Sequence, residues 1–147
     1  MLKPTNTDYL FKFSIVTAVY NVEAYLSEAI DSILSQDIGF IESVELILVD
    51  DGSTDASGAI CDEYQHKYPE NIVVIHKTNG GVASARNAGI AVARGRYVNF
   101  MDSDDKLTPD TLSSVYDFFI EHDKEVDLVS VPIFYFEQKN EPHRLNY

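Results

Sequence analysis

The sequence predicts an α/β domain in which a mostly parallel sheet is covered by helices on both faces. Segments with strand character alternate along the chain with segments of helical periodicity, and the connections between them are short. The segment at residues 44–49 is nearly all apolar, as expected of a strand that is buried on both faces. Because the chain has 147 residues, of which 45% are hydrophobic, we expect one domain over residues 1–147.

Five strands and four helices are expected in strict alternation. β-branched and aromatic residues predict strands at residues 13–19, 44–49, 72–76, 97–101 and 127–131. Apolar residues at helical spacing predict helices at about residues 23–36, 56–67, 82–93 and 109–122. Thr54 or Asp55 is expected to cap the second helix, and Thr108 the fourth, with Pro109 at its first position. Beyond Pro132, residues 133–136 are expected to continue as an extended edge segment.

Polar loops follow four of the predicted strands. In an open parallel sheet the carboxyl ends of the strands meet at one edge, where ligands bind. We therefore expect one rim to carry the residue groups Tyr20-Asn21, Asp50-Asp51, Asn79-Gly80-Gly81 and Asp102-Ser103-Asp104. The convergence of these loops is a stronger signal than any one of them.

Three carboxylates crowd together directly after the strand at residues 97–101. Asp102, Asp104 and Asp105 lie within four positions, so each raises the pKa of the others unless a cation is present. Hard divalent cations such as Mg²⁺ or Mn²⁺ prefer oxygen ligands. The cluster therefore predicts a metal site, and the alternative is a solvated set of helix-capping aspartates.

Two further side chains suggest a nucleoside diphosphate as the ligand. The Asp51 carboxylate can accept a hydrogen bond from a base N–H, which uracil offers at its N3 position and cytosine does not. Arg86 lies one turn into the third predicted helix, and its guanidinium can bind a diphosphate. The alternative for Arg86 is a surface ion pair with an acid.

The composition of the chain excludes some classes of function and indicates its cellular compartment. The formal net charge of -13 disfavours nonspecific nucleic-acid binding, so no nucleic-acid partner is expected. The single cysteine, Cys61, rules out an internal disulfide and is expected to be a small buried side chain. Neither a signal peptide nor a transmembrane segment is expected. We expect a cytoplasmic protein, with a peripheral membrane contact in the longer polypeptide.

Four motifs resemble those of family 2 glycosyltransferases of the GT-A fold, in that family's order and spacing. They are SIVTAVYN at residues 14–21, LVDDGSTD at 48–55, NGGVASARNAG at 79–89 and GRYVNFMDSDD at 95–105. The resemblance implies a Rossmann-like three-layer α/β/α sandwich. It covers roughly residues 13–111. In the first motif, many relatives have a proline before the Tyr, and this chain has Val19 there.

The resemblance also implies roles for individual residues. The turn at residues 17–21 and Asp51 would hold the nucleoside, usually uridine, with Asp50 supporting the loop. The DxD motif would hold a divalent metal, Mn or Mg, through Asp104 and Asp102, with Asp102 also near the ribose or sugar. The nucleotide-sugar-binding residues expected are Thr17, Ala18, Tyr20, Asn21, Asp50, Asp51, Asn79, Gly81, Arg86, Asn87, Asp102 and Ser103.

The family's catalytic base is expected beyond Tyr147, so no catalytic residue is assigned within the chain. Inverting members use a later Asp or Glu to deprotonate the acceptor hydroxyl. Past Asp127 the only acids are Glu137 and Glu141, and neither stands in a recognisable base motif. We therefore expect part of a longer glycosyltransferase that is inactive by itself. The intact protein would transfer sugar from a UDP-sugar to a glycan or lipid-linked acceptor in polysaccharide biosynthesis.

Two other classes of protein are alternatives. A noncatalytic nucleotide-sugar-binding or assembly module would share the donor site. A phosphoaccepting receiver domain is a more distant alternative, because its acidic pair follows the first strand and the pair here follows the second. The sequence does not fit a calcium-binding EF-hand, because the central Gly and terminal Glu of that loop are missing. It does not fit a dinucleotide-binding site either, because no G-x-G-x-x-G follows the first strand. The oligomeric state is open, although an uncovered apolar face would favour self-association.

Overall fold

The computed structural model describes residues 9–131. The chain divides into two compact units, Met1–Ser114 and Val115–Tyr147, and each is described here by itself. The single domain expected from the length stays a prediction.

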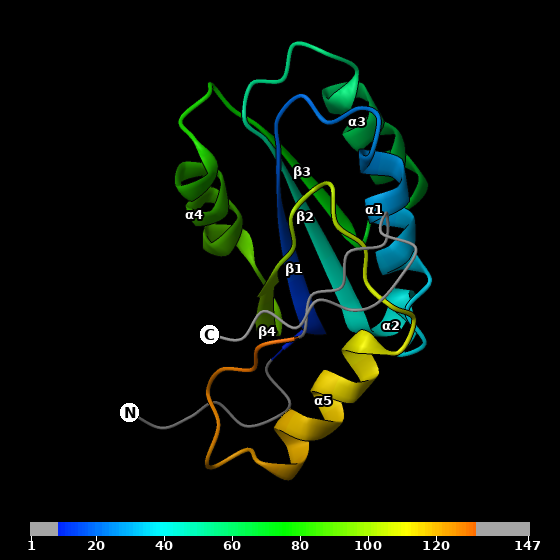
Figure 1. Cartoon of the computed structure of the whole chain (residues 1–147), viewed down its shortest axis with the longest axis vertical. Helices are drawn as coiled ribbons and strands as arrows, with labels where there is room; N and C mark the ends of the chain where they lie inside the picture. The colour runs from blue at the N-terminus through cyan, green and yellow to red at the C-terminus, as the bar shows by residue number, and fades with distance from the viewer. Residues whose placement is uncertain (1–8, 132–147) are drawn as a thin grey trace, which may run out of the picture. The chain divides into compact units, whose positions relative to one another are not determined.

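The first unit contains a four-stranded parallel sheet (Figure 1). Its strands are β1 (Phe11–Val19), β2 (Val44–Asp50), β3 (Ile72–His76) and β4 (Gly95–Phe100), in the spatial order β3-β2-β1-β4. In the register, Val19 lies beside Asp50, and Asp50 lies beside His76. The loops that follow β1, β2 and β3 therefore begin at the same edge of the sheet. This part of the fold agrees with the sequence prediction.

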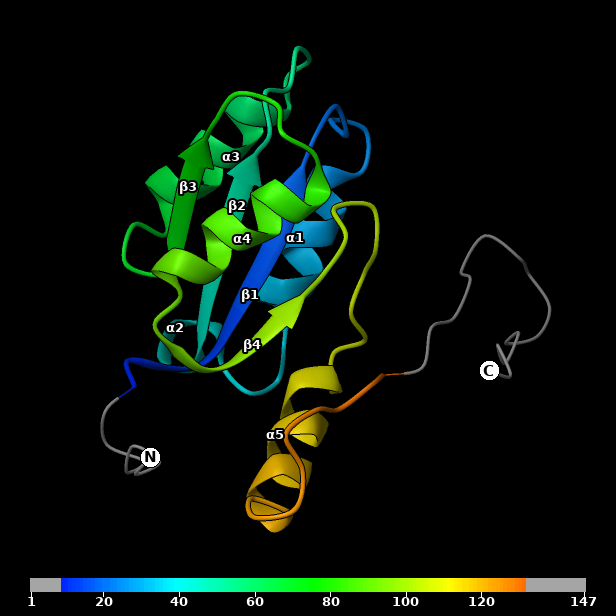
Figure 2. The ribbon, with the colours of Figure 1, turned by 90° about the vertical axis from the view of Figure 1, so that its left-hand side faces the viewer.

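Helices cover both faces of this sheet. Helices α1 (Leu26–Leu34) and α3 (Ser57–Lys67) lie on one face, and α4 (Val82–Val92) lies on the other (Figures 1 and 2). A short helix, α2 (Phe40–Ser43), precedes β2. The expected three-layer α/β/α arrangement is therefore confirmed for this unit.

The layer under α4 is packed closely because its side chains are small. Val16, Ile47 and Val49 are fully buried there together with Ala85 of the helix. A Cβ atom added to Gly89 would lie 2.4 Å from Val16 Cγ1, so only glycine allows this approach of helix to strand. The run of small residues in the sequence thus has a packing role. The opposite sheet face carries Ile15, Leu46 and Leu48, which alternate with the first set and are also fully buried.

An ion pair between the buried Glu45 and the partly exposed Arg94 lies near the start of β1 and β2, away from the loop edge. The Glu45 side chain is fully buried, and its Oε1 accepts a hydrogen bond from Arg94 Nε at 2.6 Å. Its Oε2 accepts from Ser14 Oγ at 2.7 Å, and that hydroxyl in turn accepts from Gly95 N. These bonds join β2 to β1 and to the start of β4, so they fix the register of three strands.

The first two helices differ from their predicted bounds. The predicted helix at residues 23–36 is shorter at both ends and runs from Leu26 to Leu34. Ahead of it, Val22 N donates to Ser57 Oγ and Glu23 N to Asp55 Oδ2. Helix α2 was not expected, and Gly39 precedes it with φ 85°. At α3 the N-cap residue is Ala56, without a side-chain capping bond, so the prediction of Thr54 or Asp55 as the cap was wrong. Asp55 Oδ1 instead accepts from Ser57 N in the turn that precedes the helix.

The fourth predicted helix begins later than expected. Helix α5 (Thr111–Glu121) starts two residues after Pro109, so the prediction of Pro109 as its first residue was wrong. The side chain of Gln36 explains the delay. Its Nε2 donates to Thr108 O at 2.8 Å and its Oε1 accepts from Leu112 N at 3.0 Å. These bonds hold the chain at residues 108–110 in a turn.

In the second unit, the predicted fifth strand at residues 127–131 is absent. The described part contains the remainder of α5, a turn after Glu121 and then a segment without regular structure. Leu128 is 86% exposed, and no described strand pairs with its segment. Strand propensity alone does not form a strand, because a strand needs a partner for its hydrogen bonds. The extended segment expected at residues 133–136 lies outside the described residues.

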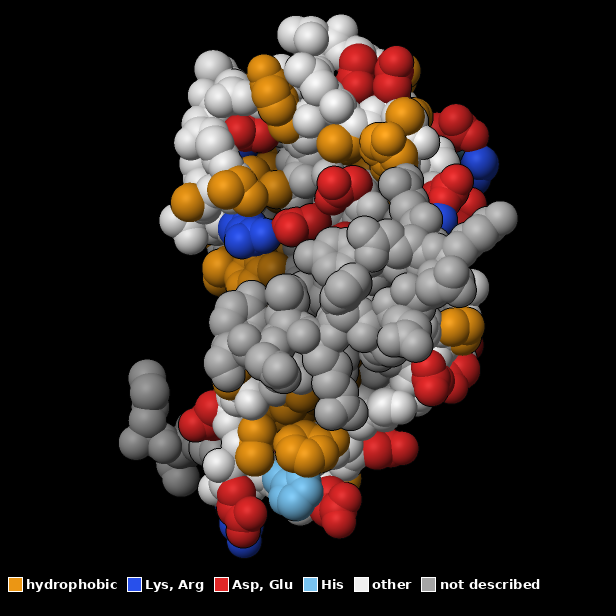
Figure 3. Space-filling model, viewed as in Figure 1, with side chains coloured by type: hydrophobic (Ala, Val, Ile, Leu, Met, Phe, Trp, Pro, Cys, Tyr) orange, Lys and Arg blue, Asp and Glu red, His pale blue; other side chains and the backbone are white. Residues whose placement is uncertain are grey.

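The surface is rich in acidic side chains, as Figure 3 shows, and hydrophobic side chains lie exposed between them. Within residues 9–131, no helix is both long enough and apolar enough to cross a membrane.

Candidate functional site

A pocket of about 440 Å³ lies at the carboxyl ends of the strands. That volume lies in the range of small-molecule sites. Its lining comes from the loops that follow β1, β2, β3 and β4, including the first residues of α4. The lining residues are Ala18, Val19, Tyr20, Asp51, Asn79, Gly81, Val82, Asp102, Ser103 and Asp104.

The pocket gathers most, but not all, of the residues expected at a site. Eight of them line it: Ala18, Tyr20, Asp51, Asn79, Gly81, Asp102, Ser103 and Asp104. The other five, Thr17, Asn21, Asp50, Arg86 and Asn87, are not part of the lining. Val82 lines the pocket without having been expected, and Val19 lines it as part of the expected turn at residues 17–21, although it was not among the expected binding residues. Their apolar side chains carry no chemical signal in the sequence.

Asp51 is held in place by donors on the loop after β3. Lys77 Nζ lies 2.5 Å from Asp51 Oδ1. Gly80 N donates to both carboxylate oxygens, at 3.0 and 3.1 Å, and Gly81 N donates to Oδ2 at 2.7 Å. Gly81 has φ 85°, a conformation that favours glycine. The bond from Lys77 lowers the pKa of the nearly buried Asp51 carboxyl, and the two amides lower it further against the effect of burial. A buried carboxylate thus faces the pocket in its ionised form.

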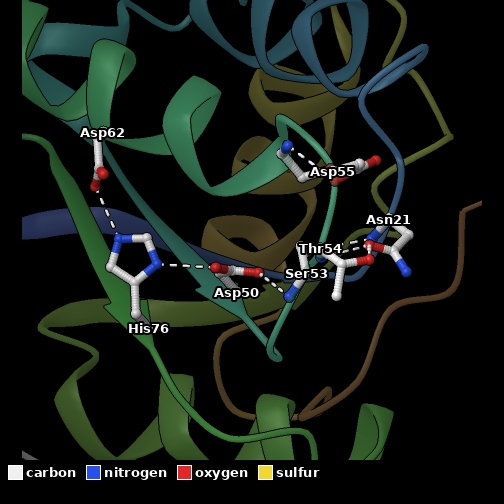
Figure 4. A network of polar contacts seen from close by, with 8 residues as sticks. Asn21, Asp50, Ser53, Thr54, Asp55, Asp62 and His76 are labelled. Atoms are coloured by element: carbon white, nitrogen blue, oxygen red, sulfur yellow. Dashed lines mark hydrogen bonds and ion pairs between the residues drawn. The ribbon is translucent and has the colours of Figure 1, made fainter.

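Asp50 and Asn21 belong to a network of polar contacts with the loop after β2 (Figure 4). Asp50 Oδ1 accepts from Ser53 N at 2.9 Å. Asn21 has φ 51°, its N donates to Ser53 Oγ and its Oδ1 accepts from Thr54 N at 2.8 Å. Both side chains therefore fix the shape of the loop after β2. This geometry suits the supporting role expected for Asp50 and gives Asn21 a structural role as well.

His76 extends this network at the end of β3. Its Nδ1 lies 2.9 Å from Asp50 Oδ2, and its Nε2 lies 2.8 Å from Asp62 Oδ1. Figure 4 shows the imidazole between the two carboxylates. The hydrogen bond to Asp50, followed by that to Asp62, raises the pKa of His76. For Asp50, burial opposes ionisation, but the bonds from Ser53 and His76 outweigh it and lower the pKa.

Thr17 lies beneath the site, inside β1. Its side chain is 1% exposed, and its Oγ1 has no hydrogen-bond partner among the described residues. Thr17 alternates with Ala18, which does line the pocket, so the two side chains lie on opposite faces of the sheet. The Thr17 side chain is therefore not placed to contact a ligand in this pocket.

Arg86 pairs with the first aspartate of the DSD sequence. Arg86 Nη2 donates to Asp102 Oδ1 at 2.7 Å, and its guanidinium carbon lies 5.6 Å from the centre of the Phe100 ring. Both members of the pair are partly exposed, so their attraction is screened by water. Asn87 is exposed on the same helix. The ion pair anticipated for Arg86 as an alternative is thus present, and it places this cation at the edge of the pocket.

In the described part of the chain, the remaining acids after β4, Asp104 and Asp105, form no ion pair with a basic side chain. Asp104 is exposed and lines the pocket, whereas Ser103 beside it is buried. Burial, followed by repulsion from Asp104 and Asp102, raises the pKa of Asp105. Within residues 9–131, no group of three or more His, Cys, Asp or Glu is arranged to hold a metal ion. The oxygen atoms of Asp102 and Asp104 are suitable ligands for a hard cation.

Lys77 and His76 are polar residues at the site that sequence reasoning also missed. The sequence analysis selected Asn79, Gly80 and Gly81 in this loop but not Lys77 before them. A usable signal was present: Lys77 is a basic residue in a chain of net charge -13, and it follows β3 at the edge that carries Asp51. A cation at that position is expected to bind the neighbouring acid.

Comparison with known proteins identifies the family. The chain matches the glycosyl transferase family 2 over residues 14–147. It belongs to that family. The chain is 52% identical over 136 residues to the minor teichoic acid biosynthesis protein GgaB of Bacillus subtilis, a match that covers 92% of this chain and 15% of GgaB. It is 43% identical over 136 residues to GgaA of the same organism, covering 91% of this chain and 30% of GgaA.

The family 2 fold is also found among solved structures. The crystal structure of Staphylococcus aureus TarS 1-349 in complex with UDP-GlcNAc superposes with a TM-score of 0.71 at 33% identity, covering 84% of this chain and 38% of that one. The expected GT-A fold is thereby confirmed. The chain spans less than a third of the length of GgaB and GgaA, so it corresponds to a part of those proteins.

Proposed function

We propose that this chain is the donor-binding part of a glycosyltransferase and that it binds a UDP-sugar in the pocket. The observation that carries the proposal is the presence of Asp51 and the Asp102–Asp104 segment on the walls of one pocket, at the carboxyl ends of β2 and β4. The nucleoside binds at Asp51, and the diphosphate extends toward the loop after β4. The TarS structure with UDP-GlcNAc supports the choice of nucleotide.

The nucleobase is recognised through an acceptor. The Asp51 carboxylate is ionised, nearly buried and turned to the pocket, so it accepts a hydrogen bond from N3–H of uracil. Tyr20 lies on the same wall and is half exposed, so its ring is available to contact the base. Asn21 and Asp50 act indirectly, because they hold the loop that carries Asp51.

The diphosphate needs positive charge in a chain that is strongly acidic. Asp104 and Asp102 would hold a divalent cation, Mn²⁺ or Mg²⁺. Burial, followed by repulsion from Asp104 and Asp102, raises the pKa of the neighbouring Asp105. When bound, such a cation stabilises negative charge on the leaving nucleoside diphosphate. Arg86 is the protein's own cation at this edge. It leaves Asp102 and donates to the diphosphate.

In the whole protein, the acceptor hydroxyl attacks the anomeric carbon from the face opposite the nucleotide, and the transfer inverts the configuration. A carboxylate outside this chain, beyond Tyr147, removes the proton. The acceptor is a glycan or lipid-linked molecule. The teichoic acid biosynthesis named for GgaB and GgaA supports a cell-wall polymer of that kind. Catalysis next to such an acceptor is compatible with a cytoplasmic protein that touches the membrane peripherally.

The proposal is tested by calorimetric titration of the chain with UDP, with CDP as the control ligand. Each titration is run with Mn²⁺ and with a chelator, on the wild type, on Asp104→Ala and on Asp37→Ala. Asp37 is an exposed aspartate outside the pocket and is the matched control. We expect UDP to bind more tightly than CDP, with a gain from Mn²⁺ that Asp104→Ala removes and Asp37→Ala keeps. Equal binding of UDP and CDP, or a metal gain that survives in Asp104→Ala, would contradict the proposal.

A further inference from the structure

Lys77 lies behind the pocket and is bonded to the residue that faces it. Its Nζ is 2.5 Å from Asp51 Oδ1 and donates to Thr78 O at 2.8 Å. Its backbone N donates to Asp50 O at 2.9 Å, so the main chain of Lys77 is fixed to the end of β2. The Lys77 side chain is 22% exposed and is not part of the pocket lining. The direct connection of Lys77 to a lining residue is therefore its bond to Asp51.

We propose that Lys77 is a positioning residue that sets nucleobase specificity, because it fixes the Asp51 carboxylate as a pure hydrogen-bond acceptor toward the base. The ligand class is a nucleotide whose base presents an N–H at that point, which is uracil rather than cytosine. This inference rests on the proposed function, in which Asp51 receives the base. It adds Lys77 to the proposed site and gives a physical reason for the selectivity for uracil over cytosine.

The reason is that burial and ionisation oppose each other at Asp51. A carboxyl group this well buried favours its neutral form unless donors compensate it. The bond from Lys77 is the largest influence that lowers the Asp51 pKa, and the Gly80 and Gly81 amides add smaller ones. A neutral carboxyl would carry its own O–H, which could donate to the ring nitrogen of cytosine. Lys77 thus prevents the pairing that would admit the wrong base.

The other cations near the site are occupied elsewhere. Arg86 pairs with Asp102, and His76 lies between Asp50 and Asp62. Among residues 9–131, Lys77 is the one basic side chain bonded to Asp51. Loss of its charge is therefore not compensated by another side chain in the described geometry.

The test compares UDP with CDP binding over a range of pH, in the presence of Mg²⁺. The variants are Lys77→Met, which keeps the length and removes the charge, and Lys77→Arg, which restores a charge. Lys67→Met is the matched control, because Lys67 is an exposed lysine paired with Glu63 outside the pocket. CDP carries the same diphosphate as UDP, so titration of the phosphate cancels in the ratio of the two affinities.

For the wild type, Lys67→Met and Lys77→Arg, we expect the preference for UDP to be independent of pH between about pH 5.5 and 8. In Lys77→Met the preference for UDP over CDP should fall about tenfold or more as the pH is lowered across that range. This factor corresponds to the free-energy cost of one mispaired buried polar group. NMR of the Asp51 carboxyl carbon, without nucleotide, should show a higher pKa in Lys77→Met than in the wild type. A purely structural role of Lys77 would weaken UDP and CDP equally at every pH.

The possible outcomes distinguish a failure of the proposed UDP-sugar site from a failure of the role proposed for Lys77. A wild-type chain that does not prefer UDP over CDP would contradict the proposed function, and the inference would fail with it. A wild type that prefers UDP, together with a Lys77→Met variant whose preference is equally large and independent of pH, would overturn the inference alone. An Asp51 pKa that is the same in both proteins would also overturn it, whichever nucleotide binds. If Lys77→Met does not fold, Lys77→Gln takes its place with the same expectations.

Discussion

The loops after β2 and β4 both line the pocket, but their carboxylates are compensated in different ways. Asp50 and Asp51 accept bonds from Ser53, His76, Lys77 and two glycine amides, and the pKa of each is lowered. After β4, Asp102 has a partly exposed pair with Arg86, while burial and its acidic neighbours raise the pKa of Asp105.

This difference suggests a division of labour within the pocket. Where the protein supplies the donors itself, the carboxylate is already in the charge state and orientation that a base requires. Where negative charge is left in excess, the ligand has to bring a cation with it. In the proposed UDP-sugar site, the nucleoside end would therefore be preorganised, and the diphosphate end would be completed by binding.

The largest expected effect that distinguishes the two loops is on stability. Asp51→Ala leaves the Gly80 and Gly81 amides and the Lys77 ammonium without their acceptor, which should lower the free energy of unfolding by about 2–3 kcal/mol. Asp104→Ala removes an exposed carboxylate and should change it by less than about 0.5 kcal/mol. Urea unfolding followed by circular dichroism measures both. Equal losses in the two variants would mean that the loops are not held differently.

A smaller effect is expected from the pH dependence of the groups around the loop after β2. His76 has a raised pKa, so its contribution to stability is fully present below about pH 6.5 and is lost as the pH rises through its folded pKa. Asp50 has a lowered pKa, so its contribution is present above its ordinary value of 3.8 and is lost as the pH falls below it. Between these limits the loop is most stable.

This pH effect is checked by thermal melting of wild type and His76→Gln at several pH values above neutrality. The wild type should lose stability as the pH rises, by no more than a few tenths of a kcal/mol because His76 is about half exposed. His76→Gln should lack this loss. His66→Gln, which changes a histidine outside this network, is the control. A slope that persists in His76→Gln would show that another group titrates.

The sheet and its faces could be predicted because the signals for them are local. The apolar run of β2 and the small residues of α4 already show which surfaces are buried. The element bounds depend on long-range contacts instead. The sequence does not show that Gln36 captures the backbone at Thr108, or that Ser57 and Asp55 satisfy amides ahead of α1. The missing fifth strand is a similar case, because its segment has the right residues and no described partner.

The candidate site could be predicted at the level of loops but not of contacts. Strand order brings Asp51 and Asp104 to one edge, and this follows from alternation and topology. The pairing of Asp51 with Lys77 depends on the conformation at residues 77–81, where Gly81 has positive φ. The Asp50–His76–Asp62 network likewise requires a side chain from α3 to reach the end of β3. Neither contact has a signature in local sequence.

The most direct test of the division within the pocket is an NMR titration of backbone amides with uridine, and then with UDP and Mg²⁺. We predict that uridine shifts the signals of Gly80 and Gly81 and leaves those of residues 102–105 unchanged. UDP with Mg²⁺ should shift both groups of signals. In Asp104→Ala, only the shift of residues 102–105 should be lost. If uridine moves residues 102–105 as strongly as the glycines, or if UDP with Mg²⁺ leaves them unmoved, the division of the pocket into two ends is contradicted.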